Sequence, residues 1–221
     1  MNIVLYDFDR TLTKYDTIFS LGIAIASEKK RPFKTICRFI ASLLKLKLRR
    51  ISNDEFKNRC AMLLLAGESE EKINRIIEKY LSRRLDSLID TEVYNTIVKN
   101  QSRGNGVYIV SSNYDFFVNR FINLWRLSGV VATRAQIVNG IFSGKLLDKS
   151  CEGPQKVRRV RELFGDAVAG QAVAYGDSRG DLELLKYVRQ GFWVRRGFRG
   201  KAKFMDFRSG DLTCSSAGDK R

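Results

Sequence analysis

Short apolar runs that alternate with helical segments constrain the fold of this chain more than any other feature. The runs cover residues 2–6, 107–110, 129–134, 172–177 and 191–196. Helical periodicity fills most of the sequence between them. Strands alternating with helices in this way predict an α/β fold built on a doubly wound parallel sheet.

The longest helical stretch, residues 16–102, stands between the first two runs. Ser52 or Asn53 is a candidate N-cap, Gly67 a candidate stop, and a further helix starts from Ser69. We therefore expect a core made of residues 1–15 and 104–205, with an all-helical cap inserted at 16–103. The final residues, 206–221, are expected to be disordered.

A second pattern interrupts this alternation. Asn139-Gly140 stands between alternating residues in QIVNGIFSGKLL. Asn-Gly is the strongest short signal for a two-residue hairpin, so the sequence predicts a β-hairpin here.

Polar side chains stand where the predicted strands end. Asp7 and Asp9 follow the first run, Ser111 and Ser112 the second, and Asp177 the fourth. Open α/β sheets bind ligands at the carboxyl ends of their strands. The sequence therefore places a candidate site at this edge of the sheet.

Asp7 and Asp9 are the most informative pair. Like charges this close resist joint ionisation unless a cation shares them or one keeps its proton. Mg²⁺ takes oxygen ligands from one or two carboxylates, substrate phosphate and water. One aspartate can then act as nucleophile and the other as general acid and base. Taken alone, the pair is more often a simple cap on the following turn.

Three further sequence features are consistent with a phosphate and metal site at Asp7 and Asp9. Asp181 follows Asp177 by four residues, a spacing that can turn both carboxylates toward one cation, although turn and cap roles explain it equally well. Ser111 and the backbone N–H groups after it can hold phosphate oxygens. Lys156, near a predicted helix start, can neutralise a transferring phosphoryl group.

The composition excludes some chemistries and favours an anionic partner. The chain has no histidine, which removes Ser-His-Asp, Cys-His and histidine-ligated metal mechanisms. Its formal net charge is +16, which suggests a phosphorylated substrate, an acidic lipid surface or nucleic acid. The four cysteines show no CxxC spacing, so we expect free thiols and a cytoplasmic protein.

In order and spacing, these pieces resemble the four motifs of the haloacid dehalogenase superfamily. The matching residues are Asp7-Phe8-Asp9-Arg10-Thr11-Leu12-Thr13, Ile109-Val110-Ser111, Lys156, and Gly176-Asp177-Ser178-Arg179-Gly180-Asp181. The resemblance covers about residues 1–195. It is greatest to the phosphoserine phosphatase-like branch, in which a cap is inserted between the first two motifs. Arg10 departs from the family, which often has glycine there.

The resemblance implies a phosphoric monoester hydrolase that works through an aspartyl-phosphate. Asp7 would be the nucleophile and Asp9 the general acid and base. Mg²⁺ would be held by Asp7, the backbone carbonyl of Asp9, and Asp177, supported by Asp181. The substrate phosphate would be bound by a further set of residues, namely Thr11, Ser111, Ser112 and Lys156.

The predicted cap contains an amphipathic basic helix at residues 33–50. Its apolar residues are Phe33, Ile36, Cys37, Ile40, Leu43 and Leu44, and its basic residues fall mostly on the other side. Such a helix can pack on its neighbours or lie on an anionic membrane surface. With the apolar stretch Ile18 to Ala26, it resembles the insert of the phosphatidylglycerophosphatase C type of lipid-phosphate phosphatase. That stretch is about half of the roughly 20 residues that a spanning helix needs.

Two substrate classes and two other functions therefore stay open. The substrate is either a lipid phosphate, with peripheral contact at the inner membrane surface, or a small soluble metabolite such as phosphoserine. For the phosphoserine reading, Asp16 stands where a cap glutamate is usual. A phosphotransferase would pass the phosphoryl group to an acceptor other than water. A non-catalytic protein would use its charge on nucleic acid, which is not the expected partner because no nucleic-acid motif is present.

Overall fold

The computed structural model describes residues 2–196 and 202–207, and the chain divides into two compact units. The first unit comprises Met1–Tyr15, Leu88–Ala132 and Cys151–Arg221. The second comprises Asp16–Ser87 and Thr133–Ser150. The fold is described below for each unit separately.

The first unit is built on a six-stranded sheet with the strand order β3-β2-β1-β6-β7-β8. β1 is parallel to β2 on one side and to β6 on the other, β6 is parallel to β7, and β8 is antiparallel to β7. The strands are β1 (Ile3–Tyr6), β2 (Gly106–Tyr114), β3 (Gly129–Thr133), β6 (Val173–Gly176), β7 (Gln190–Arg196) and β8 (Ala202–Asp206).

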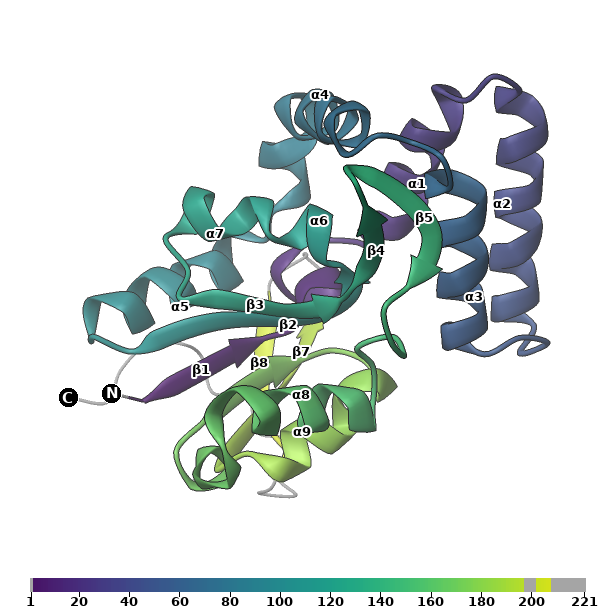
Figure 1. The fold of residues 1–221 in the computed structure, drawn as a ribbon. Coiled ribbons are helices and arrows are strands. Elements are labelled where there is room, and N and C mark those ends of the chain that lie inside the picture. Colours follow the sequence, from purple (N-terminus) through teal and green to yellow (C-terminus); the bar gives the residue numbers. More distant parts are fainter. Residues whose placement is uncertain (1, 197–201, 208–221) are drawn as a thin grey trace. The chain divides into compact units, whose positions relative to one another are not determined.

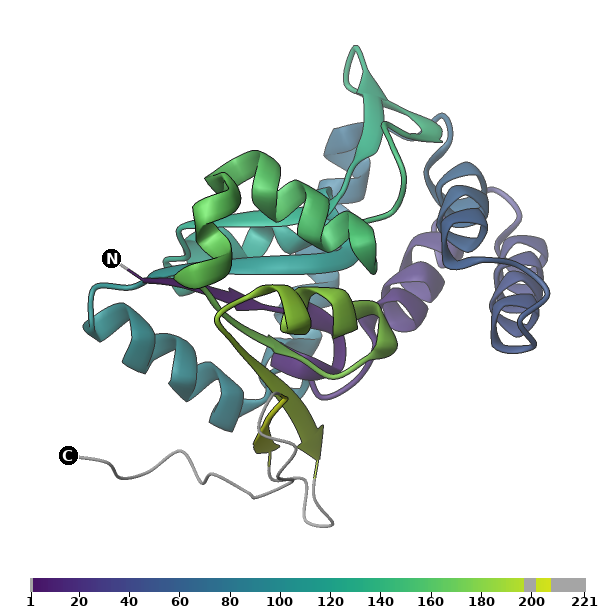
Figure 2. The same cartoon turned by 90° about the horizontal axis from the view of Figure 1, so that it is seen from below.

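Helices cover both faces of this sheet, as Figure 1 shows, with α5 and α7 on one side and α8 and α9 on the other. In Figure 2, α8 and α9 lie in front of the strands. The helices are α5 (Thr91–Ser102), α6 (Asp115–Val118), α7 (Arg120–Trp125), α8 (Pro154–Phe164) and α9 (Leu182–Tyr187). The predicted doubly wound α/β fold is therefore confirmed.

The core between the sheet and α8–α9 follows from the apolar runs. Leu5 and Val110 of the central strands are completely buried against Val160 and Leu185 of the two helices. Parallel strands buried on both faces read as nearly continuous apolar runs. The burial of these strands on both faces therefore explains why the sequence contains short apolar runs at their positions.

β8 was not predicted. It pairs with β7, where Phe204 lies opposite Val194, and Phe207 donates its backbone N–H to the carbonyl of Gly191 at 2.8 Å. The expected disordered tail, 206–221, therefore starts too early, because Asp206 ends this strand. Residues 208–221 lie outside the described part of the chain.

The second unit is mainly helical. It contains α1 (Thr17–Ser27), α2 (Pro32–Lys47), α3 (Asn53–Cys60), the helical turn η2 (Ala61–Leu65), α4 (Glu70–Leu88) and the two-stranded sheet of β4 (Ala135–Val138) and β5 (Ile141–Leu146). Ser52 caps α3 by accepting the backbone N–H of Glu55 at 3.1 Å. In the sequence, part of this unit follows β1 and part follows β3.

The β4–β5 hairpin confirms the Asn-Gly signal. Asn139 and Gly140 have φ values of +50° and +74°, and Val138 lies opposite Ile141. Positive φ at both central residues is the type I′ geometry that asparagine and glycine tolerate best.

The units differ from the expected cap and core ranges in two places. Residues 88–103, including α5, belong to the unit with the large sheet, and the hairpin region 133–150 belongs to the helical unit. Tyr6 on β1 shows why α5 belongs with the sheet: its hydroxyl lies 2.8 Å from that of Thr96. In the described residues, no helix combines the length and the apolar character needed to cross a bilayer.

Candidate active site

Asp7 stands at the end of the central strand, where both neighbouring strands surround it. Its backbone N–H donates to the carbonyl of Tyr175 on β6 at 2.8 Å, so the ladder continues one residue past β1. Tyr6 lies opposite Ile109 on β2, which brings Val110 and Ser111 to the same edge. Burial of Asp7 is nearly complete.

Two further aspartates join Asp7 from the β6 side. Ligand oxygens of Asp7, Asp177 and Asp181 lie within 4.8 Å of one another. Asp177 follows β6, and Asp181 lies at the start of α9. The sheet therefore brings together three carboxylates that the sequence placed at two strand ends.

Lys156, near the start of α8, ties this cluster together. Its Nζ donates to Oδ1 of Asp7 at 2.6 Å, to Oδ1 of Asp181 at 2.5 Å and to the carbonyl of Val110 at 2.8 Å. The side chain is 2% exposed. An ammonium group has three N–H donors, and here each has a protein acceptor. The visible role of Lys156 is thus to hold Asp7 and Asp181 in place.

The cluster is short of positive charge. Three ionised carboxylates carry more negative charge than the buried Lys156 and the exposed Arg10, which lies beside Asp177, can neutralise. Burial raises the pKa of Asp7 well above its ordinary value, and the carboxylate of Asp181 adds to this rise. Burial and Asp181 likewise raise the pKa of Asp177 to about 6. Burial lowers the pKa of Lys156, but the carboxylates of Asp181 and Asp7 outweigh it and hold that pKa above its usual range.

Asp9 lies apart from this cluster and has a partner of its own. Its Oδ2 accepts the side-chain amide of Asn113 on β2 at 2.9 Å. Asn113 is completely buried and also receives the backbone N–H of Tyr114 at 2.7 Å on Oδ1. Its own backbone N–H donates to the hydroxyl of Ser111 at 3.0 Å. The end of β2 therefore orients both Asp9 and Ser111.

The loop after β1 explains two other predicted positions. Arg10 has a φ of +62°, a left-handed conformation in which glycine is least strained, and its Nε lies 3.3 Å from Oδ2 of Asp177. The hydroxyl of Thr11 donates to Oδ1 of Asp177 at 3.4 Å. Thr11 thus contacts a carboxylate of the cluster in this structure.

The donor set fits Mg²⁺. Hard cations of this kind prefer carboxylate oxygens and are bound by one or two of them together with substrate phosphate. The excess negative charge of the cluster favours a bound cation, and the raised pKa values of Asp7 and Asp177 are expected for buried carboxylates that lie close to a third one, Asp181.

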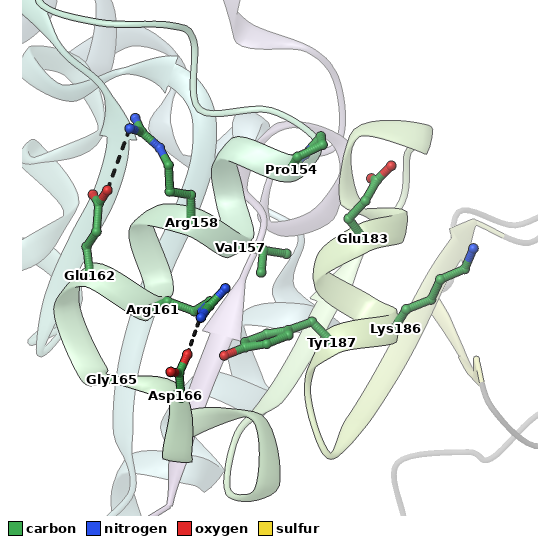
Figure 3. A pocket seen from close by; sticks show the side chains of 10 residues that line it. All are labelled: Pro154, Val157, Arg158, Arg161, Glu162, Gly165, Asp166, Glu183, Lys186 and Tyr187. Carbon is green, nitrogen blue, oxygen red and sulfur yellow. Dashed lines mark hydrogen bonds and ion pairs between the residues drawn. The ribbon is translucent and has the colours of Figure 1, made fainter.

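One groove of the first unit is lined by none of these three aspartates. It has a volume of about 790 Å³ and lies between α8 and α9, where Figure 3 shows Tyr187 near the ion pair of Arg161 and Asp166. Arg158 and Glu162 form a second pair on its wall. Neighbouring opposite charges compensate each other there. The acidic cluster at the sheet edge is therefore the better candidate for chemistry.

Sequence reasoning assigned no role to three residues of the site, although two of them, Gly176 and Ser178, belong to the matched motif segment. Asn113 directly follows the two predicted serines. Ser178 donates its hydroxyl to Oδ2 of Asp181 at 2.7 Å, and its backbone N–H donates to the same oxygen at 3.0 Å. Gly176 leaves room for Asp181. The Ser178–Asp181 spacing is that of a capping box, and this signal was available in the sequence.

A family model of haloacid dehalogenase-like hydrolases matches residues 4–186. The chain belongs to this family. As a haloacid dehalogenase-like hydrolase, it carries the four motif segments on the strand ends and helix starts described above.

Individual relatives agree with this assignment. A putative hydrolase from Mycobacterium leprae is 23% identical over 83% of this chain, which spans 63% of that relative's length. Protein CicA from Caulobacter vibrioides is 26% identical over 88% of this chain and 87% of its own. A solved structure of phosphoserine phosphatase, described as a phospho-aspartyl intermediate analogue, has a TM-score of 0.59 at 19% identity, covering 86% of this chain and 84% of its own. The similarity to this phosphoserine phosphatase structure shows a shared fold.

Gly176→Ala tests the packing of the acidic cluster. A Cβ on Gly176 would lie 2.5 Å from Cβ of Asp181 and 2.7 Å from its carboxyl carbon. We expect the substitution to displace Asp181 and with it Lys156, so that turnover falls at least about tenfold. Gly170→Ala is the matched control, since nothing lies within 4 Å of the added Cβ. Equal activity of the two variants would show that the cluster tolerates the displacement.

Proposed function

We propose that this hydrolase is a Mg²⁺-dependent phosphomonoesterase in which Asp7 is the nucleophile and Asp9 the general acid and base. The observation that supports it is the arrangement of Asp7. It is buried at the end of β1, its Oδ1 is held by Lys156, and the carboxylates of Asp177 and Asp181 lie beside it. Asp9, two residues on, has a separate anchor in Asn113.

The first step transfers the phosphoryl group to the protein. A carboxylate oxygen of Asp7 forms a bond to phosphorus while the bond from phosphorus to the ester oxygen breaks. Asp9 gives its proton to the departing oxygen, so the product leaves as an alcohol. The solved phosphoserine phosphatase named above is described as carrying an analogue of such a phospho-aspartyl state.

The second step restores the enzyme. Asp9, now ionised, takes a proton from water while the water oxygen bonds to phosphorus. The bond between phosphorus and Asp7 breaks, phosphate is released and both carboxyl groups return to their starting forms. The hydrogen bond from Asn113 keeps Asp9 in one orientation for both proton transfers.

Asp7, Asp177 and the backbone carbonyl of Asp9 would hold Mg²⁺, with Asp181 in support. When bound, the ion supplies positive charge that offsets the charge of the substrate phosphate. Ser111, Ser112 and Thr11 are proposed to bind the phosphoryl oxygens. Lys156 is proposed to stabilise the negative charge of the phosphoryl group through its position beside Asp7.

The substrate is proposed to be a small phosphomonoester, as for the phosphoserine phosphatases that share this fold. A lipid phosphate is the second candidate, favoured by the exposed apolar side chains of α2, such as Phe33 and Leu44. The phosphatidylglycerophosphatase C resemblance of the insert stays a prediction.

Phosphate release from a panel of phosphomonoesters, with and without Mg²⁺, tests the function. The panel contains phosphoserine, sugar phosphates, nucleotides and phosphatidylglycerophosphate in detergent. Release that requires Mg²⁺ supports the proposal, and an added alcohol that captures the phosphoryl group would identify a phosphotransferase instead. No release from any member, together with salt-sensitive DNA binding, would contradict it.

Asn113→Ala is expected to impair Asp9 without removing it. The variant loses the amide that fixes Oδ2 of Asp9, so general acid catalysis weakens. We expect kcat to fall roughly tenfold to a hundredfold for alkyl phosphates. The fall should be smaller for nitrophenyl phosphate, whose leaving group needs little protonation. Equal losses on both substrates would indicate that Asn113 only supports the fold.

The carboxylate cluster also predicts opposite pH responses with and without Mg²⁺. Asp177 has a pKa of about 6 in the fold against an ordinary 3.8. The folded metal-free protein therefore keeps a proton that the unfolded chain has lost, and its stability should fall as the pH rises from about 4 to about 6. Mg²⁺ binds the ionised form, so its stabilising effect should grow over the same interval. Thermal unfolding with and without Mg²⁺ measures both trends, and Asp177→Asn should weaken them and leave the part that the raised pKa of Asp7 contributes.

A further inference from the structure

The packing of α2 leaves most of its apolar side chains in solvent. Phe39 is the one buried residue of this helix, and its ring lies 6.2 Å from that of Phe19 and 6.4 Å from that of Phe56. Gly22 on α1 permits this contact, since a Cβ there would overlap the Phe39 ring. The inward face of α2 is therefore set by Phe39.

Part of the apolar side of α2 faces outward, while Ile36 and Leu43 are half-buried. Phe33 is 80% exposed, Leu44 is 53% exposed, and Leu48, just past the helix, is 65% exposed. Ile40 and Cys37 are also exposed. At 100° per residue these positions form one stripe, turned roughly a third of the circumference or more from the direction of Phe39. We define the outer stripe as Phe33, Cys37, Ile40, Leu44 and Leu48.

A row of cations runs beside the outer stripe. Lys34, Arg38 and Lys45 occupy the adjoining strip of the helix surface and are exposed. Residues 29–53 contain nine basic residues and no acidic one. Within the described residues, none of Lys34, Arg38 and Lys45 forms an ion pair.

This charge pattern is unfavourable for a helix in water alone. Lys34 and Arg38 are like charges one turn apart, and basic residues near the helix start oppose the helix dipole. Other exposed cations of the same unit have partners at this spacing, such as Arg59 with Glu55 and Arg75 with Glu71. An anionic surface would supply the charge that α2 lacks.

A groove adjoins the cationic row on the side of α3. It lies between α2 and α3, which are side by side in Figures 1 and 2, and has a volume of about 680 Å³. Arg38, Ser42 and Lys45 line it from α2, and Asn58 and Met62 line it from α3 and η2. Glu55 and Arg59 of α3, which pair with each other, also line the groove. The two remaining cations, Arg38 and Lys45, suit a phosphate group, and the volume is in the range of small-ligand sites.

We propose that the outward face of α2 docks on an anionic phospholipid surface. The outer stripe enters the boundary between headgroups and acyl chains, while Lys34, Arg38 and Lys45 contact lipid phosphates. A second copy of this chain would bring the same positive charges against these cations. A nucleic-acid backbone would leave the outer stripe uncovered. An anionic lipid surface would cover the apolar outer stripe and also neutralise the cations beside it.

Co-sedimentation with vesicles tests this surface without using turnover. The full chain is mixed with vesicles of phosphatidylcholine alone or of phosphatidylcholine with phosphatidylglycerol. The first variant is Phe33→Ser/Leu44→Ser/Leu48→Ser, and the second is Lys34→Gln/Arg38→Gln/Lys45→Gln. Matched controls carry Val98→Ser/Leu124→Ser/Leu163→Ser or Lys99→Gln/Arg189→Gln/Lys203→Gln, which change exposed side chains of the other unit.

We expect the wild-type chain and both controls to sediment with the anionic vesicles and not with the neutral ones. Each α2 variant should bind at least about tenfold more weakly. All variants should keep their melting temperature, because the substituted side chains are exposed. An inactive Asp7→Asn protein should bind as wild type, which separates this proposal from the proposed function.

Several results would overturn it. A wild-type chain that stays in the supernatant, or α2 variants that bind as the controls do, would exclude the lipid surface. Light scattering that shows self-association abolished by the apolar variant would assign the outer stripe to a second copy. Retention on DNA that is lost only in the charge variant would assign the cations to nucleic acid.

Discussion

Asp7→Asn should abolish phosphate release and leave the fold intact. The amide cannot attack phosphorus, so we expect turnover to fall at least about a thousandfold. The side chain keeps its size, and its carbonyl oxygen can still accept the hydrogen bond that Lys156 donates. Phosphate release and circular dichroism on the same sample measure the two effects.

The same variant should be more stable without metal than the wild type. Asp7, Asp177 and Asp181 carry more negative charge than Lys156 neutralises, and the change removes one buried charge. Asp86→Asn, an exposed change on α4, is the control for a simple charge effect. Metal-dependent release that persists in Asp7→Asn would exclude Asp7 as nucleophile.

Lys156→Met should destabilise the protein strongly. Methionine matches the length of lysine but offers no donor, so Asp7, Asp181 and the carbonyl of Val110 all lose a buried partner. Breaking a buried ion pair on one side costs about 3–5 kcal/mol, which lowers the melting temperature by roughly 10 °C for a chain of this size. Thermal unfolding without metal measures this.

A double variant separates lost charge from lost packing. Lys156→Met/Asp181→Asn removes one of the stranded carboxylates, so it should regain part of the stability that Lys156→Met loses. Lys99→Met on the exposed side of α5 should change the melting temperature little. A Lys156→Met protein that melts as the wild type does would show that the ion pairs contribute nothing to stability. Its activity should be low in any case, because Asp7 loses the contact that orients it.

The positions of the site residues followed from the sequence because they depend on strand ends. Asp7 and Asp177 close apolar runs, and parallel neighbours bring such ends to one edge. Lys156 was harder to place, since one lysine among forty basic residues has no local signal. Its three buried contacts come from β1, β2 and the start of α9, segments far apart in the chain.

Local chemistry thus allowed the sequence by itself to predict the strand and helix alternation, the Asn139-Gly140 hairpin and the acidic strand ends. These features depend on residues close together in the chain. Only the tertiary structure decided which unit the hairpin joins, that Asn113 holds Asp9, and that the outer stripe of α2 faces solvent. Periodicity shows that a helix has an apolar side. Which side faces inward depends on a close approach such as that of Phe39 on Gly22, which joins residues on two different helices.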